Sequence, residues 1–205
     1  ANDPAVQRLG EGDEHDDVFT VHTLDGTPLQ ITVKITGVND TPTFSGDSTG
    51  GVTEDLNVNG DGKLTDSGKL NVSDVDHDQS AIDPTSVTPD AGTLGSLTID
   101  ANGNWSYSVP NDLVQYLKAG ETKVETFTVK SVDGTATTIS VTITGVNDPA
   151  VIGGDASGHV TEDLNVNGDG KLTDSGKLSV TDDDGGQSSF DPASGTPATG
   201  TLGSL

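Results

Sequence analysis

The amino-acid sequence repeats itself with a period of 108 residues, counted from Val52 to Val160. Val52–Leu70 returns as Val160–Leu178 without a single change, and two shorter segments return at the same offset: Ile35–Asp40 as Ile143–Asp148, and Thr93–Leu97 as Thr201–Leu205. A period of this length is that of a whole domain, because the repeats of solenoid proteins are only about 20–50 residues long. The offset predicts a tandem array in which 41–148 is one complete repeat, 1–40 is the C-terminal part of the preceding repeat and 149–205 is the N-terminal part of the following one.

The chain is strongly acidic, with 33 Asp and Glu against 9 Lys and Arg. The complete repeat alone holds 16 acidic residues and 5 lysines, which gives a charge of −11. Such a surface repels the phosphates of nucleic acids and anionic lipids, so we expect no nucleic acid partner. No apolar run is long enough to span a bilayer, so we expect no membrane insertion. The sequence has no cysteine, which excludes disulfides and thiolate metal sites.

Apolar residues alternate with polar ones in several short segments, which is the pattern of strands with one buried face. The alternation over 97–109, 124–131 and 138–143 predicts inward-facing side chains, among them Trp105, Tyr107, Phe127, Ile139 and Val141. Asn-Gly at 102–103 and Asp-Gly at 133–134 predict two hairpin turns. Together with further strands over 43–54 and 70–74 and a weaker one over 82–87, the repeat has about seven strands. We therefore predict an all-β fold of immunoglobulin-like β-sandwich modules, linked end to end.

Only Asn111–Ala119 has a helical pattern, as a short crossover with Leu113 and Leu117 pointing inward. Its counterpart in the preceding repeat is Pro4–Gly12. With seven strands, each module would join the next at the opposite pole, through short linkers that leave little freedom to tumble. The neighbouring repeats of the same chain are therefore the first expected partners.

Acidic and amide residues recur at the predicted strand ends and linkers. A calcium ion takes about 6–8 oxygen ligands from carboxylates, amides, backbone carbonyls and water. Four motifs offer such ligands in both copies: Asn39, Asp40, Asn147 and Asp148 in the linkers; Glu54, Asp55, Glu162 and Asp163 after the first strand; Asp74, Asp76, Asp182 and Asp184 after the next; and Asp25 and Asp133 in a hairpin. We predict a calcium site at the joint between modules, built from Glu54–Asp55, Asn147–Asp148 and Asp182 with Asp184. The alternative is that these are solvated turn residues.

The segment Asp55–Asp66 resembles an EF-hand loop in its first six positions, with Asn57, Asn59 and Asp61 as further candidate ligands. However, no helices flank it, and Asp66 stands where the loop normally has Glu. A register that begins at Asn57 fits about as well. We favour a β-turn between two strands over a calcium loop here.

Nothing in the sequence predicts an enzyme. No Ser, His and Asp set recurs, and the four histidines have no counterparts at the repeat offset. An alternative function is a module that itself binds a glycan or a protein, for which Asp78–Gly92 is the best candidate loop.

Several motifs in a fixed order resemble the VCBS repeats of very large RTX-type adhesins of Gram-negative bacteria. They are the linker G-V-N-D-x-P, the opening V-T-E-D, the following L-x-V-x-D-x-D, and D-P-A-V-Q-x-L-G-E-G at Asp3–Gly12. The N-D-x-x-P linker and the D-x-D motifs are also similar to those of cadherins, which hold calcium between sandwiches. Leu56–Lys63 departs from the pattern, since the usual loop after V-T-E-D is shorter.

The resemblance implies an extracellular protein at the bacterial cell surface, exported by type I secretion. It implies calcium-stiffened extender domains that support cell adhesion or biofilm formation. Other modules of the parent protein would then bind the host or surface glycan or protein.

Overall fold

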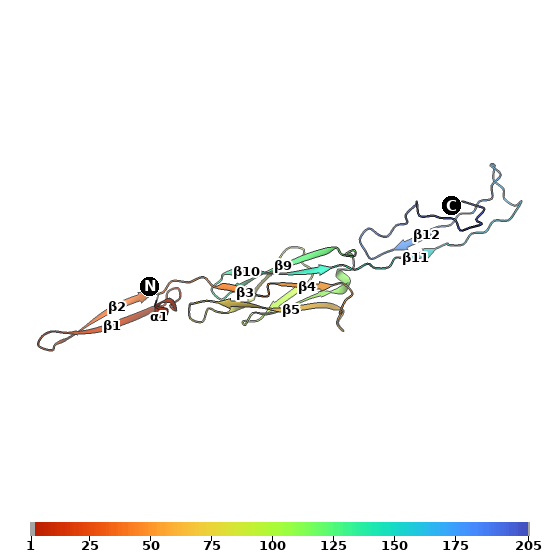
Figure 1. Ribbon diagram of the computed structural model, residues 1–205. Helices are drawn as coiled ribbons and strands as arrows, with labels where there is room; N and C mark the ends of the chain where they lie inside the picture. The colour runs from red at the N-terminus through yellow and green to blue at the C-terminus, as the bar shows by residue number, and fades with distance from the viewer. Residues whose placement is uncertain (1–2, 205) are drawn as a thin grey trace.

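The computed structural model describes residues 3–204 and has the form of an extended rod (Figure 1). The first segment contains a short helix, α1 (Pro4–Gln7), and a hairpin of β1 (Glu14–His22) and β2 (Pro28–Thr36). The complete repeat follows, and the last segment contains a second pair of antiparallel strands, β11 (Val151–Gly154) and β12 (Leu178–Thr181). The three segments follow one another along the rod (Figure 1). No helix in the described part of the chain is long and apolar enough to cross a membrane.

The complete repeat is a sandwich of two four-stranded sheets. One sheet has the order β3 (Thr43–Gly46), β5 (Lys63–Ser73), β8 (Asn104–Pro110) and β7 (Ser96–Ile99), and all its pairs are antiparallel. The other has the order β4 (Thr49–Thr53), β10 (Ala136–Thr144), β9 (Thr122–Ser131) and β6 (Ile82–Pro89), with β4 parallel to β10. The predicted β-sandwich is confirmed. The predicted strand 43–54 is divided, because the chain changes sheets at Gly46, whose φ is +89°.

The core lies between the two sheets and consists of the predicted inward-facing residues. Tyr107, Val109, Val129, Ile139 and Val141 are fully buried. Tyr107 and Phe127 pack edge to face across the sheets, with ring centroids 5.9 Å apart. The indole of Trp105 is buried as well and donates a hydrogen bond to the carbonyl oxygen of Asp47 at 2.8 Å. Both predicted hairpin turns are present, between β7 and β8 and between β9 and β10.

The crossover after β8 is not the amphipathic helix that the sequence predicted. Only one 3-10 turn forms, η1 (Asn111–Leu113). Leu113 is 47% exposed, whereas Val114 and Leu117 are buried. The prediction for Leu113 was therefore wrong, because a single tight turn followed by loop does not keep the spacing of an α-helix.

The linker begins with a glycine that packs against this crossover. Gly145 donates a backbone hydrogen bond to Glu121 at 2.8 Å and accepts one from Gly120 at 3.0 Å. A Cβ at Gly145 would lie 2.3 Å from the carbonyl oxygen of Leu117. The chain needs a glycine here because the two backbones approach too closely for any side chain. The linker is thereby fixed to the pole of its own module.

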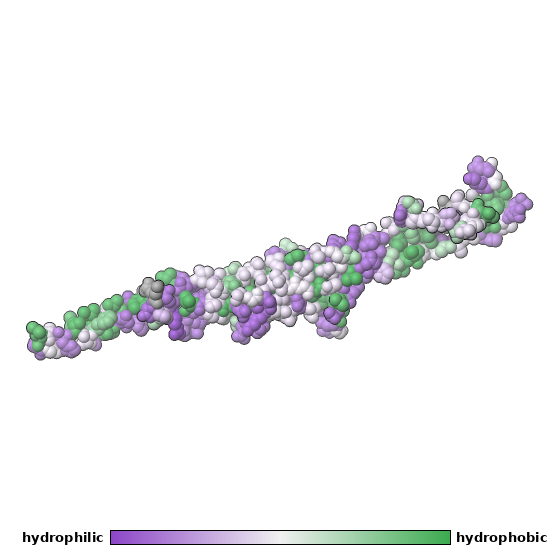
Figure 2. All heavy atoms as spheres, viewed as in Figure 1, coloured by the Kyte–Doolittle hydropathy of each residue, from purple (hydrophilic) through white to green (hydrophobic). Residues whose placement is uncertain are grey.

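The hairpin of β1 and β2 carries the apolar pattern of β9 and β10 but lies outside a sandwich. Phe19 is 54% exposed, whereas Phe127 at the same repeat position is 1% exposed. Figure 2 shows apolar surface along this hairpin and along the last segment. The two phenylalanines differ in exposure because β1 and β2 pair only with each other. In contrast, β9 and β10 lie between β4 and β6 in a four-stranded sheet.

Candidate metal centre at the joints between repeats

The second joint, between the complete repeat and the last segment, brings together carboxylates from three places in the sequence. Glu54 follows β4, and its backbone N–H continues the pairing with β10 by a bond to Thr144. Its side chain is fully buried (0% exposed), and one carboxylate oxygen accepts the backbone N–H of Val146 at 3.0 Å. Beyond the linker, the backbone N–H of Asp148 donates to Asp184 at 3.1 Å. The fold thus places the end of β4, the linker and the loop after β12 at one joint.

Burial, together with repulsion among these carboxylates, raises the pKa of two of them. Burial is the main cause that raises the pKa of Glu54, and the negative charges of Asp148, Asp55 and Asp184 add to it. Burial and the same kind of repulsion, from Asp55 and Asp182–Asp184, raise the pKa of Asp148. The charges are therefore close enough to disfavour one another's ionised form.

The first joint, between the first segment and the complete repeat, has the same arrangement. The backbone N–H of Asp40 donates to Asp76 at 2.9 Å, as Asp148 does to Asp184. Asp76 is also held within the loop after β5, because the backbone N–H of Asp76 donates to the side-chain carboxylate of Asp74 at 2.9 Å. Asp182 and Asp184 repeat this contact at 3.0 Å. Asp-x-Asp therefore forms the same turn twice, with the second carboxylate aimed at the linker.

Four carboxylate oxygens at the joints are buried and have no hydrogen-bond partner: Oδ2 of Asp74, Oδ1 of Asp76, Oδ2 of Asp148 and Oδ1 of Asp184. Asp76 is 3% exposed and Asp184 is 1% exposed, so neither side chain can be solvated freely. Unpaired buried carboxylate oxygens are unfavourable, and a hard cation is the partner that suits them. The residues present therefore fit calcium. Within residues 3–204, no group of three or more His, Cys, Asp or Glu side chains is arranged so that it could hold a metal ion, so ion binding stays a prediction.

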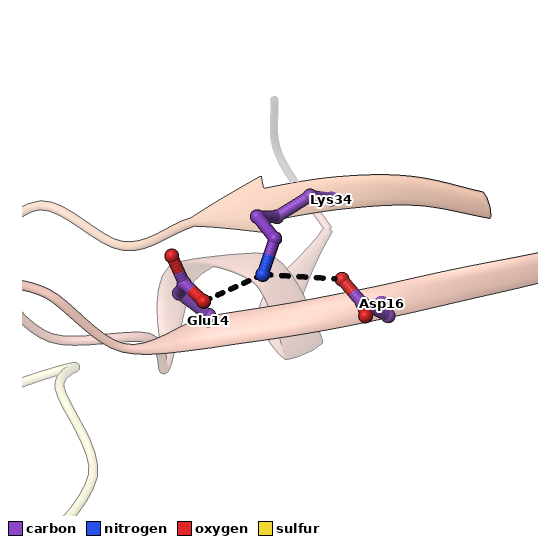
Figure 3. Close-up of polar contacts among 3 residues, drawn as sticks. All are labelled: Glu14, Asp16 and Lys34. Carbon is purple, nitrogen blue, oxygen red and sulfur yellow. Dashed lines mark hydrogen bonds and ion pairs between the residues drawn. The ribbon is translucent and has the colours of Figure 1, made fainter.

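Lysine and arginine do not neutralise these carboxylates. Among residues 3–204, the only Lys or Arg that pairs with a carboxylate is Lys34, on the hairpin of the first segment. Its ammonium lies 2.6 Å from Glu14 and 3.6 Å from Asp16 (Figure 3). The hairpin thus carries a partly compensated cluster, whereas no Lys or Arg within residues 3–204 pairs with the carboxylates of the joints. In Figure 2 strongly hydrophilic surface gathers where the segments meet.

The remaining predicted ligands are placed as follows. Asn39 lies at the first joint and donates to Asp133 at 3.5 Å, so the hairpin carboxylate reaches the linker. Asp133 also accepts bonds from Ser131 and Thr135 of its own turn, and these hydrogen bonds lower its pKa despite partial burial. Asn147 donates to the carbonyl oxygen of Asp148 at 2.9 Å.

Three predicted ligands are exposed and lie outside these contacts. Asp25 caps its own turn through Thr23 and Thr27, and those bonds lower its pKa. Glu162 and Asp163 lie in an exposed turn of the last segment, after β11. Calcium binding by these three residues stays a prediction without support from the geometry.

The EF-hand-like segment forms the turn that we favoured. The side-chain oxygen of Asn59 accepts the backbone N–H groups of Asp61 and Lys63, both at 3.0 Å. Asp66 lies on β5 and accepts the N–H of Gly51 at 2.7 Å, while Asp55 contacts the crossover after β8. The first and last positions of the supposed loop therefore have different partners. Asn57, with φ of +57°, and Asp61 are exposed turn residues.

Sequence reasoning missed two amides and one carboxylate at the second joint. Asn111 and Gln115, from the crossover, donate to Asp55 and Glu54. Asp183 of the last segment lines an open cleft of about 730 Å³ together with Asp61, Asp112 and Gln115. Amides in a loop have no periodic pattern, so only their proximity to the acidic motifs in space reveals them.

The segment Asp78–Gly92, considered above as a ligand-binding loop, is mostly strand. β6 takes up Ile82–Pro89 and pairs with β9, with an irregularity between Asp83 and Thr88. A long free loop is therefore absent from this stretch, which removes the main argument for a glycan- or protein-binding surface on the module.

Comparison with known proteins gives one family and several structures. The model of a family described as a bacterial cadherin-like domain matches residues 39–145. No curated protein matches the chain. The chain is similar to a solved structure of a Ca²⁺-stabilized adhesin that helps an Antarctic bacterium bind ice, with 20% identity over 84% of this chain and 46% of that one and a TM-score of 0.29.

Two further solved structures have comparable similarity. One is of a 1.5-MDa bacterial ice-binding adhesin, with 24% identity over 65% of this chain and 42% of that one and a TM-score of 0.27. The other is of the extracellular cadherin domains 1–5 of protocadherin gamma B2, with 16% identity over 88% of this chain and 45% of that one and a TM-score of 0.40. The chain spans less than half the length of each of the three structures.

Proposed function

The chain belongs to the family of bacterial cadherin-like domains, as the match over residues 39–145 shows, and we propose that it is a calcium-rigidified spacer of a cell-surface adhesin. Cadherin-like domains are structural modules and typically not enzymes. The partners of each module in this proposal are the neighbouring repeats of the same chain. The closer assignment, to VCBS-type repeats of an RTX-type adhesin, is part of the proposal.

The unpaired carboxylate oxygens at both joints carry this proposal. At the second joint we assign Glu54, Asp55, Asp148, Asp182 and Asp184 as ligands, with Asn147 beside them. At the first joint we assign Asn39, Asp40, Asp74, Asp76 and Asp133. A bound calcium ion would supply the positive charge and the oxygen coordination that these groups lack.

The carboxylates of each joint come from both modules that meet there. Without a cation, the carboxylates of Asp148 in the linker and Asp184 in the following module repel each other, although the backbone N–H of Asp148 donates a hydrogen bond to the Asp184 carboxylate. Removal of this repulsion would favour the arrangement in which both modules contribute ligands. Binding to the folded state alone would also stabilise the fold, by about 2.7 kcal/mol per site at a hundredfold excess over Kd.

We further propose that the parent protein is extracellular, at a bacterial surface, and reaches it by type I secretion. The absence of cysteine suits a chain that is stiffened by an external cation rather than by disulfides. The spacer would hold adhesive modules away from the cell and so support adhesion or biofilm formation. The glycan or protein target would be bound by those other modules.

The test compares the whole chain in calcium, in magnesium and in chelator. Trp105 is the only tryptophan and is buried in the complete repeat, so its fluorescence follows the unfolding of that module. Small-angle X-ray scattering of the same samples gives the maximum dimension and its spread. We expect calcium, but not magnesium, to raise the melting temperature and to narrow the distribution of dimensions.

Two double variants locate the effect. Asp148→Asn with Asp184→Asn removes two charges at the second joint and should lose part of the calcium response. Asp16→Asn with Asp17→Asn removes the same charge from β1, outside both joints, and should keep the full response. Identical melting and scattering in calcium and chelator would overturn the proposed function.

A further inference from the structure

The two carboxylates that end β4 are held by amides from the crossover. Gln115 donates from Nε2 to Glu54 at 2.9 Å and to Asp55 at 3.1 Å. Asn111 donates from Nδ2 to the same oxygen of Asp55 at 2.7 Å, and its own side-chain oxygen accepts the backbone N–H of Asp55 at 3.0 Å. With the bond from Val146 to the second oxygen of Glu54, both carboxylates are fixed within one module.

Neutral amides fix a carboxylate without neutralising it. Lys34 shows the other solution on the hairpin, where an ammonium lies between Glu14 and Asp16 and offsets one of their two charges. An ammonium or guanidinium next to Glu54 would compete with a divalent cation for the same oxygens. An amide gives orientation and leaves the negative charge in place. The bonds to Glu54 and Asp55 therefore suit residues that must stay charged yet ordered.

The glutamine recurs at the repeat offset. Gln7 of α1 occupies the position of Gln115, and Asp3 that of Asn111. Across the joint, the following module presents the 1% exposed Asp184, one of whose oxygens has no partner. The complete repeat thus contributes carboxylates that amides hold in place, and the following module contributes a carboxylate with an unpaired oxygen.

We propose that Gln115 and Asn111 are positioning residues of the second joint, whose side-chain amides hold Glu54 and Asp55 ready for a divalent cation. This inference rests on the proposed calcium-binding function. The amides act through the carboxylates and need not touch the ion. Outer-shell partners of this kind typically change metal affinity by about 10–100-fold when they are removed.

The test uses the complete chain labelled with ¹⁵N and titrated with calcium. The amide signals of Val146 and Asp148 report the second joint, while that of Asp40 reports the first joint in the same sample. Gln115→Leu should weaken calcium binding at the second joint by about tenfold and leave the first joint unchanged. Gln7→Leu, at the equivalent exposed position of α1, is the matched control and should leave the titration at Val146 unchanged.

A second variant separates positioning from simple stabilisation. Gln115→Arg keeps hydrogen-bond donors near Glu54 and Asp55 but adds a positive charge. We expect it to raise the melting temperature in chelator and, at the same time, to weaken calcium binding at the second joint. A merely structural role would move both quantities in the same direction.

Glu54→Gln separates the proposed calcium binding at this joint from the proposed positioning role of the amides. If Glu54→Gln weakens calcium binding at Val146 and Gln115→Leu does not, the positioning role is wrong and the calcium function stands. If neither variant changes the titration, the proposed site at this joint is itself wrong. An affinity for Gln115→Arg equal to that of the wild type would also overturn the positioning role.

Discussion

The backbone N–H of Gly185 donates a hydrogen bond of 3.0 Å to the carbonyl oxygen of Tyr116, which links the last segment to the complete repeat. His77 makes the same bond to Arg8 at 3.1 Å in the first joint. Each pair lies 108 residues from the other, although none of the side chains agree. Because only backbone groups take part, these two bonds do not depend on which residues occupy the four positions. Three of the carboxylates beside them, in contrast, recur at the repeat offset: Asp40, Asp74 and Asp76 in the first joint, and Asp148, Asp182 and Asp184 in the second.

His77→Gly should therefore leave the first joint intact, since the second joint has glycine at that position. We expect scattering in calcium to give the maximum dimension of the wild type. Asp76→Asn, one residue earlier, should broaden the distribution of dimensions, because it removes charge from a buried carboxylate that contacts the linker. A larger effect for His77→Gly than for Asp76→Asn would contradict this division between backbone and carboxylates.

Glu54→Gln should stabilise the chain at neutral pH in chelator. Burial and the nearby carboxylates raise the pKa of Glu54 above its usual 4.5, so its ionised form is disfavoured in the folded protein. Each unit of such a shift corresponds to about 1.4 kcal/mol once the group is ionised in both states. The neutral amide of the variant avoids that penalty. Its nitrogen cannot accept a hydrogen bond, so one of the two bonds to Glu54 is lost, but Gln115 keeps Asp55 as an acceptor while the remaining oxygen still accepts from Val146. The melting temperature should therefore rise in chelator, while the gain from added calcium should become smaller.

The pH dependence of this difference has a definite sign. Between its usual pKa and the raised value, the folded protein binds more protons at Glu54 than the unfolded chain, so stability falls as pH rises through that window. The advantage of Glu54→Gln in chelator should accordingly disappear as pH is lowered towards 4.5. Melting curves of both proteins from pH 7 downwards measure it. An advantage that stays constant over this range would show that the ionisation of Glu54 is not its cause.

Gly145→Ala should destabilise the complete repeat. The new methyl group would lie 2.3 Å from the carbonyl oxygen of Leu117 and 2.5 Å from that of Lys118, and neither backbone can move freely. We expect a loss of about 1–3 kcal/mol, as for other overpacked sites. Gly51→Ala on β4 is the control, because its nearest contact would be an ordinary 3.7 Å. Denaturant unfolding followed through Trp105 should separate the two variants.

The strands could be predicted from the sequence because alternation is a local property of a half-buried strand. It gave the inward directions of Phe127 and Ile139 correctly. The same alternation places Glu125, two residues before Phe127, on the inward face of the strand. The sequence therefore indicated that Glu125 is buried, although a charged residue is not expected in a core. The crossover was predicted less well. Val114 and Leu117 are the buried residues, three apart, since a 3-10 turn replaces the expected helix.

The joint was predictable only in part. Counting strands sufficed to bring Glu54 near Asp148, because the predicted first strand, although divided into β3 and β4, ends parallel to β10, so that Glu54 lies at the pole where the linker begins. The amides of Gln115 and Asn111 were not predictable, since a loop that approaches another loop leaves no periodic trace. Asp183 was missed for a different reason. It lies between Asp182 and Asp184 and was not among the predicted ligands, yet its charge acts on Asp148.

The buried carboxylate of Glu125 should stabilise the module independently of calcium. Glu125 is 2% exposed and accepts hydrogen bonds from the hydroxyl of Tyr107 at 2.8 Å and from the backbone N–H groups of Leu94 and Gly95 at 2.6 and 3.0 Å. Glu125 on β9 thus connects its own sheet to two parts of the other one, namely the segment just before β7 and the strand β8. The contact with Glu125, after burial itself, also raises the pKa of Tyr107.

Glu125→Ala leaves three donors without their acceptor, each of which costs about 1–3 kcal/mol when it stays buried and unpaired. Tyr107→Phe removes a single hydrogen bond to a charged group, worth about 1.5–3 kcal/mol. We therefore expect Glu125→Ala to be the more destabilising of the two in denaturant unfolding. The free-energy difference from the wild type should be equal in calcium and in chelator, because Glu125 lies in the sandwich and not at a joint. A calcium-dependent difference would mean that the core and the joints are coupled.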